Sequence, residues 1–209
     1  MKIKKIIIYA LIFILTLNAC KDQDAKEIKY KIDTKDVLFY KNTGIKDKTA
    51  HTLFAEGLEL VDIQDFEKAK EKFLKADKIE SRNPIILNAI ALSEAKLENI
   101  EKSIGILLNI ISIDSTYTKT YVNLSQNYMR NRDYEKAKEI LLKGKKYTSN
   151  KDLHTKSVLL LNLAISYSNL GDCENGVKYS SEALEISQDE KFRDFIKKVQ
   201  LESKNCVEK

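Results

Sequence analysis

The side chains with the greatest potential for chemistry are few: two histidines and three cysteines among 209 residues. His51 and His154 lie far apart in the sequence, on expected surface turns, and neither has a second ligand at the spacing of a metal site. They complete no Ser-His-Asp or Cys-His set, and the chain has no Cys-x-x-Cys pair, Gly-x-Gly-x-x-Gly segment or Walker loop. The sequence therefore predicts no enzymatic activity, no metal and no cofactor.

Cys20 stands apart because of the segment that precedes it. Three lysines near the start are followed by a twelve-residue apolar run at 6–17, which is shorter than the about 20 residues that a membrane-spanning helix needs. The run has the length of a signal-peptide core, and the sequence Leu-Asn-Ala-Cys at 17–20 resembles a bacterial lipobox. The resemblance implies a signal peptide at 1–19 and lipidation of Cys20, which would anchor the mature chain in a membrane. An uncleaved short membrane anchor is the alternative.

The charge balance changes if this segment is removed. The chain has 36 Lys and Arg against 31 Asp and Glu, and loss of the three lysines in 1–19 lowers its net charge from +5 to +2. A nearly neutral, exported chain is a poor candidate for a nucleic-acid partner. Residues 20–49 are rich in Lys and Asp, which predicts a mostly flexible tether behind the lipid. We expect a lipid-anchored protein of the bacterial cell envelope, on the periplasmic or surface face of the outer membrane.

The remaining chain must supply the elements that position any binding residues. One proline, six glycines and 43% hydrophobic residues favour helices with short connections over a β-sandwich or barrel. A short motif of the form Asp-Tyr-Glu-Lys-Ala recurs four times, with its last residues 34, 34 and 39 positions apart. The four copies lie at 65–69, 99–103, 133–137 and 172–176.

The period and the motif resemble those of the tetratricopeptide repeat (TPR), a helix–turn–helix unit. The resemblance covers residues 50–190 and implies an all-α fold, a right-handed α-solenoid of four repeats at 50–83, 84–117, 118–151 and 157–190. A helical stripe formed by Phe192, Phe195, Ile196 and Val199 then predicts a C-terminal capping helix within 191–209, which covers the last repeat. The five additional residues in the third spacing predict a longer helix end or loop around 145–155.

Small residues stand wherever the two helices of a repeat should cross most closely. The eight such positions are Gly57, Ala91, Ser125 and Ala164 in the first helices, and Ala69, Ser103, Ala137 and Gly176 in the second. A short polar residue precedes each second helix, where its side-chain oxygen can cap free backbone N–H groups. These expected caps are Asp65, Asn99, Asp133 and Asp172. Glu94 departs from the family pattern, since it occupies a place that is usually aromatic.

What the resemblance implies about function is binding, because first helices of successive repeats line a concave groove that accepts a peptide or a partner helix. On this chain the groove is expected to be apolar in repeat one, at Phe54, Leu58 and Val61, and polar and basic further on. The predicted binding residues are Asn88, Lys119, Asn123, Gln126, Arg130 and Asn162. The alternative is that the asparagines serve packing between repeats or face water. Phe54 and Leu58 replace the Lys and Asn of the family's clamp for chaperone C-terminal carboxylates, so that ligand is not expected.

Two functions from different classes fit these features. The first is an interaction scaffold that holds a protein or peptide partner near the membrane, a plan similar to that of TPR lipoproteins in outer-membrane protein assembly or pilus secretin assembly. The second is a solute-binding lipoprotein that captures a glycan or peptide. The chain has no Trp, and Tyr121, Tyr128 and Tyr167 are expected in the core, so the aromatic platforms usual in glycan capture are missing.

Cys173 and Cys206 are expected to form a disulfide. An oxidising compartment favours bonded pairs, and antiparallel helices with a turn near Asp189 would bring the two cysteines level. The bond would join the capping helix to the last repeat. A buried Cys173 with a free Cys206 is the alternative.

Overall fold

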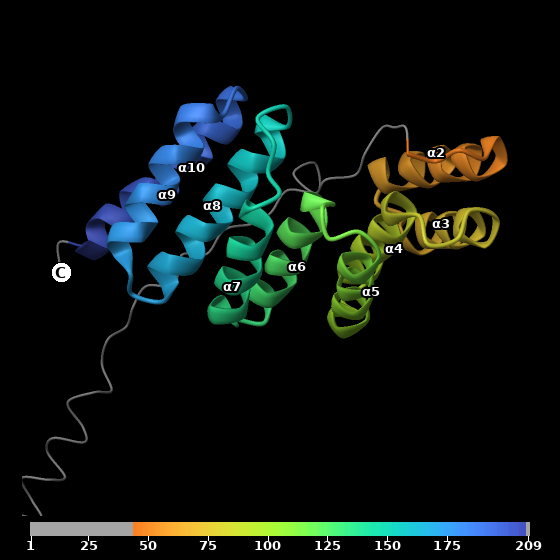
Figure 1. The fold of residues 1–209 in the computed structure, drawn as a ribbon, viewed down its shortest axis with the longest axis horizontal. Coiled ribbons are helices and arrows are strands. Elements are labelled where there is room, and N and C mark those ends of the chain that lie inside the picture. Colours follow the sequence, from red (N-terminus) through yellow and green to blue (C-terminus); the bar gives the residue numbers. More distant parts are fainter. Residues whose placement is uncertain (1–43, 208–209) are drawn as a thin grey trace, which may run out of the picture.

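The structure is a computed structural model that describes residues 44–207, in which nine α-helices and no β-strand occur (Figure 1). The helices are α2 (Lys48–Asp62), α3 (Phe66–Ile79), α4 (Pro84–Lys96), α5 (Ile100–Ile113), α6 (Thr118–Arg130), α7 (Tyr134–Lys145), α8 (Leu153–Asn169), α9 (Cys173–Ile186) and α10 (Glu190–Val207). The signal peptide, Cys20 and most of the tether, which were predicted at 1–49, lie outside the described residues.

The helices follow one another in antiparallel pairs along the long axis of the molecule (Figure 1). Each helix packs against the next one in the chain, and the first helices α6 and α8 also contact each other. The last helix, α10, packs on both α9 and α8. The prediction of an all-helical solenoid with a C-terminal capping helix is therefore confirmed.

Side chains cap the N-terminus of the second helix in three of the four repeats. The carboxylates of Asp65, Asp133 and Asp172 each accept a hydrogen bond from the backbone N–H three residues later. Asn99 was wrongly predicted to do the same, because its side-chain nitrogen instead donates to Glu94 Oε2 at 2.7 Å.

Glu94 explains this exception and its own departure from the repeat pattern. It is almost buried on α4, and its carboxylate lies 3.7 Å from Lys70 Nζ of α3. A carboxylate with so little access to water requires both a charged partner and a hydrogen-bond donor. Lys70 and Asn99 supply these, so the network joins repeat one to repeat two.

The eight small residues all lie buried in the crossings between helices. A side chain at Gly57 would collide with the ring of Phe73, and one at Gly176 would collide with Ser168 of α8 and approach Ser203 of α10. Gly176 therefore lies at a contact of three helices. There Ser168 and Ser203 share a hydrogen bond at 2.7 Å.

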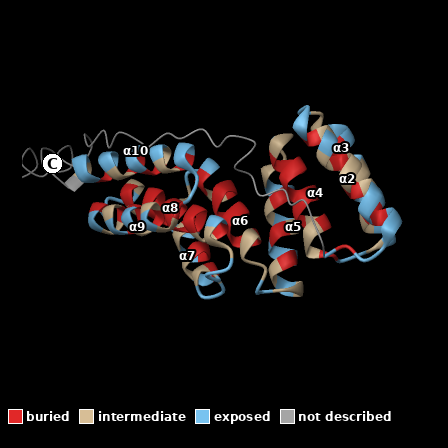
Figure 2. Ribbon diagram, turned by 90° about the horizontal axis from the view of Figure 1, so that it is seen from above, coloured by how far each residue is buried: buried red, intermediate tan, exposed pale blue. Residues whose placement is uncertain are grey.

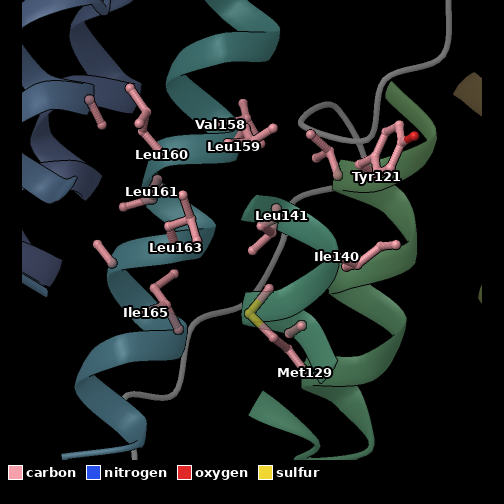
Figure 3. Close-up of a cluster of buried hydrophobic side chains, with 14 of the residues drawn as sticks. Tyr121, Met129, Ile140, Leu141, Val158, Leu159, Leu160, Leu161, Leu163 and Ile165 are labelled. Carbon is pink, nitrogen blue, oxygen red and sulfur yellow. The ribbon is translucent and has the colours of Figure 1, made fainter. Parts of the chain in front are cut away.

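The buried faces of the helices turn toward one another, whereas the outer face of α10 is exposed (Figure 2). One hydrophobic cluster fills repeat one and the start of α4, and a second extends from α4 to α10. Leu87 and Ile106 pack against both clusters, so the core is continuous. Figure 3 shows α8 in the second cluster, with Val158 and Leu159 on one side of the helix and Leu160 on the other.

The longer third spacing appears as a seven-residue connection, 146–152, together with the 17 residues of α8. Tyr147 of this connection stacks on Tyr121 of α6, with ring centroids 5.9 Å apart. The additional residues therefore cover the N-terminal end of α6.

A short leading segment is held against the end of repeat one by hydrogen bonds. The backbone N–H groups of Lys46 and Asp47 donate to Glu80 Oε2 at 2.7 and 2.8 Å, and Asn83 Nδ2 donates to Gly44 O at 2.7 Å. These backbone hydrogen bonds, together with one from Asn83, lower the pKa of Glu80. The chain thus contacts the α3–α4 turn before α2 begins. None of the helices in 44–207 is long and apolar enough to cross a membrane.

Candidate binding face

The predicted binding residues come from the first helices of three successive repeats. Asn88 belongs to α4, Asn162 belongs to α8, and the other four lie on α6. Because α6 contacts both α4 and α8, the fold brings the six residues to one side of the array. We call this side, with Leu92, Lys96 and Ile165 beside them, the binding face.

Hydrogen bonds cross the seam between α4 and α6 at two places on this face. Asn123 Nδ2 donates to Asn88 Oδ1 at 2.8 Å, and Arg130 Nη1 donates to the carbonyl oxygen of Ala95 at 2.8 Å. On the next seam, Asn162 Nδ2 lies 3.4 Å from Ser125 Oγ. The asparagines therefore join neighbouring repeats, which is the alternative that the sequence left open, and a role in ligand binding stays a prediction.

The amide side chains on the binding face are nearly buried, and two of them have hydrogen-bonding atoms without a partner in the described residues. Asn88, Asn123, Gln126 and Asn162 are between 1% and 6% exposed. Asn123 Oδ1 is buried, yet it accepts no hydrogen bond from the described residues. The Gln126 side chain likewise makes no hydrogen bond in that part of the chain. A buried amide oxygen without a donor is costly, but at 1% exposure Asn123 is accessible to a ligand only if its neighbours move.

Lys119 places a cation near the N-terminal end of α6. Burial lowers its pKa to about 8, although the negative charge of Asp152 raises it in the opposite direction. Its ammonium group lies 5.8 Å from the centre of the Tyr117 ring. A half-buried ammonium is stabilised by any anion that approaches it.

Known proteins resemble this chain in its repeats and its fold. The tetratricopeptide repeat model matches residues 118–151 and 158–190. These two segments match the tetratricopeptide repeat.

Solved structures that match over most of their length are TPR proteins or share this fold. TTC0263, a thermophilic TPR protein from Thermus thermophilus, is 18% identical with a TM-score of 0.62, over 75% of this chain and 87% of that one. The Sgt2 TPR domain from Aspergillus fumigatus is 20% identical with a TM-score of 0.54, over 66% and 89%. MamA from Desulfovibrio magneticus RS-1 is 12% identical with a TM-score of 0.57, over 78% and 91%. No curated protein matches by sequence. At these identities the structural likeness establishes the fold alone.

TPR proteins are in general non-catalytic scaffolds. The structure places the two histidines of this chain within helices. Both had been expected on surface turns, which is wrong, because His51 lies within α2 and His154 within α8. The ring of His154 packs near Phe192 of the capping helix, with centroids 6.0 Å apart. Within residues 44–207, no three His, Cys, Asp or Glu side chains are grouped to hold a metal ion.

The two C-terminal cysteines are joined in the structure. Cys173 at the start of α9 and Cys206 near the end of α10 form a disulfide whose Cα atoms are 5.8 Å apart, a separation usual for such bonds. The bond lies at the same end of the array as the Ser168–Ser203 hydrogen bond. The capping helix α10 is therefore covalently joined to α9.

Sequence reasoning missed a row of lysines that covers the tyrosines of the last two repeats. Tyr167 stacks on Tyr179 at 5.4 Å, Lys138 lies 5.7 Å from the Tyr167 ring, and Lys145 lies 4.6 Å from the Tyr179 ring. These contacts join α7 to α8 and α9 by cation–π attraction. The sequence carried a signal for these contacts. Tyr128 and Tyr167 occupy equivalent positions in repeats three and four, and the helix between them, α7, contains the lysines Lys136 and Lys138 that lie over their rings.

Proposed function

We propose that this chain is a membrane-anchored TPR lipoprotein that serves as an interaction scaffold in the bacterial envelope and binds a peptide or partner helix on its binding face. The observation that carries the proposal is the set of amide and cationic side chains that α4, α6 and α8 bring together. Among them, Arg130 is exposed and Lys119 is half-buried, so these two side chains reach the surface of the binding face.

The aromatic side chains favour a protein partner over a glycan. Tyr121 is buried, and its hydroxyl donates to Ser115 O at 2.8 Å while its ring stacks on Tyr147. Tyr167 stacks on Tyr179. Their faces are thus occupied by neighbouring rings of the chain, whereas glycan capture uses exposed aromatic faces.

The membrane anchor is proposed on the sequence at 1–20 alone, and it has its own test. Metabolic labelling with an acyl-chain probe should mark the wild-type protein, and Cys20→Ala should lose the label and accumulate as the precursor. Cys206→Ser is the matched control, because it removes a cysteine and leaves the motif unchanged. A mature-sized, membrane-retained Cys20→Ala protein would exclude lipidation.

The binding face is tested by site-specific photocrosslinking in native envelopes. A photoreactive amino acid replaces Lys96, a partly exposed residue of the binding face, or, as a control, Gln188 in the exposed connection before α10. We expect a discrete protein adduct from position 96 and none from position 188. Equal adducts from both positions, or none from position 96, would contradict binding at this face.

A further inference from the structure

The connection between α7 and α8 differs in charge from every other connection between α2 and α10. Each of the others holds at least as many carboxylates as lysines and arginines. Residues 146–152 instead hold two lysines against one aspartate, and Lys143 and Lys145 precede them at the end of α7. The run 143–151 therefore contains four lysines and no carboxylate. We call this run the basic segment.

Three of these four lysines are accessible to an external anion. Lys143, Lys146 and Lys151 are exposed, and none of them forms an ion pair with another of the described residues. Lys145 differs, because its Nζ lies 3.6 Å from Glu182 Oε2 of α9. The basic segment thus carries three positive charges that the part of the chain in 44–207 does not neutralise directly.

Hydrogen bonds and ring packing hold the basic segment in place. Thr118 Oγ1 donates to the carbonyl oxygen of Tyr147 at 3.2 Å, and the Tyr147 ring stacks on Tyr121. Directly after the segment, Asp152 caps α8, since its carboxylate accepts from Thr155 N at 3.0 Å. The lysines therefore extend from a positioned backbone, which reduces the conformational entropy lost on binding.

Tyr147 gives the basic segment an apolar component at its centre. Its side chain is 42% exposed, although it stacks on Tyr121. Tyrosine is enriched where a membrane meets water, because its ring is apolar and its hydroxyl is polar. Lysines clustered around such a ring are typical of a segment that lies on anionic lipid headgroups.

The basic segment lies on the edge of the array at which the N-terminal part of the chain arrives. Successive helices alternate in direction, so the first helices begin on one edge, and α6 and α8 both begin toward the top of Figure 1. Gly44 and Lys46 are hydrogen-bonded to the α3–α4 turn on this edge. An anchor ahead of Gly44 would bring this edge toward the membrane, and tethering raises the effective concentration of a weak site at the surface. The neighbouring α9–α10 turn carries Asp189, so the contact is confined to the basic segment.

Taken with the proposed membrane anchor, on which this inference rests, we propose that the basic segment docks on the anionic phospholipid headgroups of the anchoring membrane. Lys143, Lys146 and Lys151 pair with the headgroups, and the Tyr147 ring lies at headgroup level. Each lysine close to an anionic membrane strengthens binding about fivefold. The array is thereby held with one edge against the membrane.

Vesicle flotation tests this surface with the mature chain 20–209, expressed without residues 1–19 so that Cys20 carries no lipid. We expect binding to vesicles of phosphatidylglycerol and phosphatidylcholine in about equal parts, release at high salt, and no binding to phosphatidylcholine alone. The triple variant Lys143→Gln, Lys146→Gln and Lys151→Gln should bind about tenfold more weakly or worse.

A matched triple variant removes the same charge from other helices. Lys102→Gln, Lys198→Gln and Lys204→Gln change exposed lysines of α5 and α10, and vesicle binding should change little. Equal losses in the two triple variants, or equal binding to neutral vesicles, would overturn the inference, because the attraction would not come from the basic segment. Binding to polyglutamate but not to anionic vesicles would overturn it in favour of an acidic protein partner.

Fluorescence locates the contact on the molecule. Because the chain has no Trp, Tyr147→Trp introduces a single tryptophan in the basic segment, and Leu201→Trp on the exposed face of α10 is the control. Anionic vesicles should shift the emission of Tyr147→Trp to shorter wavelengths and leave that of Leu201→Trp unchanged. An equal shift in both variants, or a shift in neither, would overturn the inference.

The vesicle experiments and the acyl labelling of Cys20 distinguish the two proposals. Labelling of Cys20 without vesicle binding would overturn the docking surface and leave the proposed anchor intact. Vesicle binding through the basic segment without labelling would contradict the anchor and support the basic segment as a membrane contact in its own right.

Discussion

Lys119 carries its charge where burial works against it. The pKa of about 8 in the folded protein lies below the usual lysine value of 10.5, so between these values the unfolded chain binds more protons than the folded one. The free energy of unfolding contributed by Lys119 therefore increases as pH rises through that window.

This leads to a prediction for the pH dependence of stability. At about pH 7 the wild-type protein pays for a buried charge that Lys119→Gln lacks, and at about pH 10 most of that charge is gone from the folded wild type. The free energy of unfolding of Lys119→Gln, minus that of wild type, should therefore be larger at about pH 7 than at about pH 10. Urea unfolding of both proteins across this range measures the difference, in which the other titrating groups cancel. A difference that does not vary with pH would show that Lys119 titrates normally.

At the same scale, Glu94 shows what a repeat pattern cannot predict. The position was recognised as unusual because the family places an aromatic residue there. Its partner Lys70 belongs to the preceding helix α3, and its partner Asn99 lies in the connection between α4 and α5. The helical repeat pattern does not connect these three residues. Asn99 stands at the position of a helix cap, but its side-chain amide donates a hydrogen bond to the carboxylate of Glu94 instead.

At the scale of the element, two glycines illustrate how packing decides the effect of one methyl group. Gly105 lies exposed in the middle of α5, and a Cβ there would have no atom within 4 Å. Gly176 is buried in α9, where a Cβ would collide with Ser168 and approach Ser203. Helix propensity is the same for both positions, but steric cost differs.

Opposite effects are thus expected from the same substitution. Gly105→Ala should stabilise the protein by about 0.5–1 kcal/mol, because alanine restricts the unfolded chain and favours a helix. Gly176→Ala should destabilise it by about 1–3 kcal/mol, because the added methyl group would collide with the Ser168 hydroxyl and displace it from its hydrogen bond with Ser203. Thermal or urea unfolding of the two variants compares them directly. If Gly176→Ala were as stable as Gly105→Ala, the contact of three helices would be looser than described.

The elements themselves were largely predictable from the sequence. The 34-residue period, the small residues and three of the four aspartate or asparagine caps act within one repeat, so local physics specifies them. The binding face was less predictable, because Asn88 and Asn123 are 35 residues apart and pair only once α4 and α6 are side by side. The histidines were misplaced for a related reason: a polar residue in the first turn of a helix has the same sequence environment as one in a turn.

At the scale of the whole molecule, the disulfide closes the end of the array. It links residues separated by 33 positions. In the chain-entropy model, closing a loop of that size raises the free energy of unfolding by about 3–4 kcal/mol. Terminal repeats of a solenoid have neighbours on one side only and open most easily. The bond therefore acts where the intrinsic stability is lowest.

Cys206→Ser should lower the stability of the oxidised protein by about 3–4 kcal/mol and leave the reduced protein unchanged. Unfolding with and without a thiol reductant measures this, and reduced wild type provides the matched control. Non-reducing mass spectrometry should find the peptide that links Cys173 and Cys206. If both thiols of the protein isolated from cells react with an alkylating agent before reduction, the bond does not form in the cell.

The leading segment has a mechanical consequence. Gly44, Lys46 and Asp47 are fastened to Glu80 and Asn83 in the α3–α4 turn, so tension applied to the chain ahead of Gly44 reaches the array at the junction of repeats one and two. The pull first strains this group of hydrogen bonds, and α2 bears load only after they break. A scaffold tethered at its N-terminus would then transmit force from a captured partner to its anchor through the α3–α4 turn, while α2 stays unloaded.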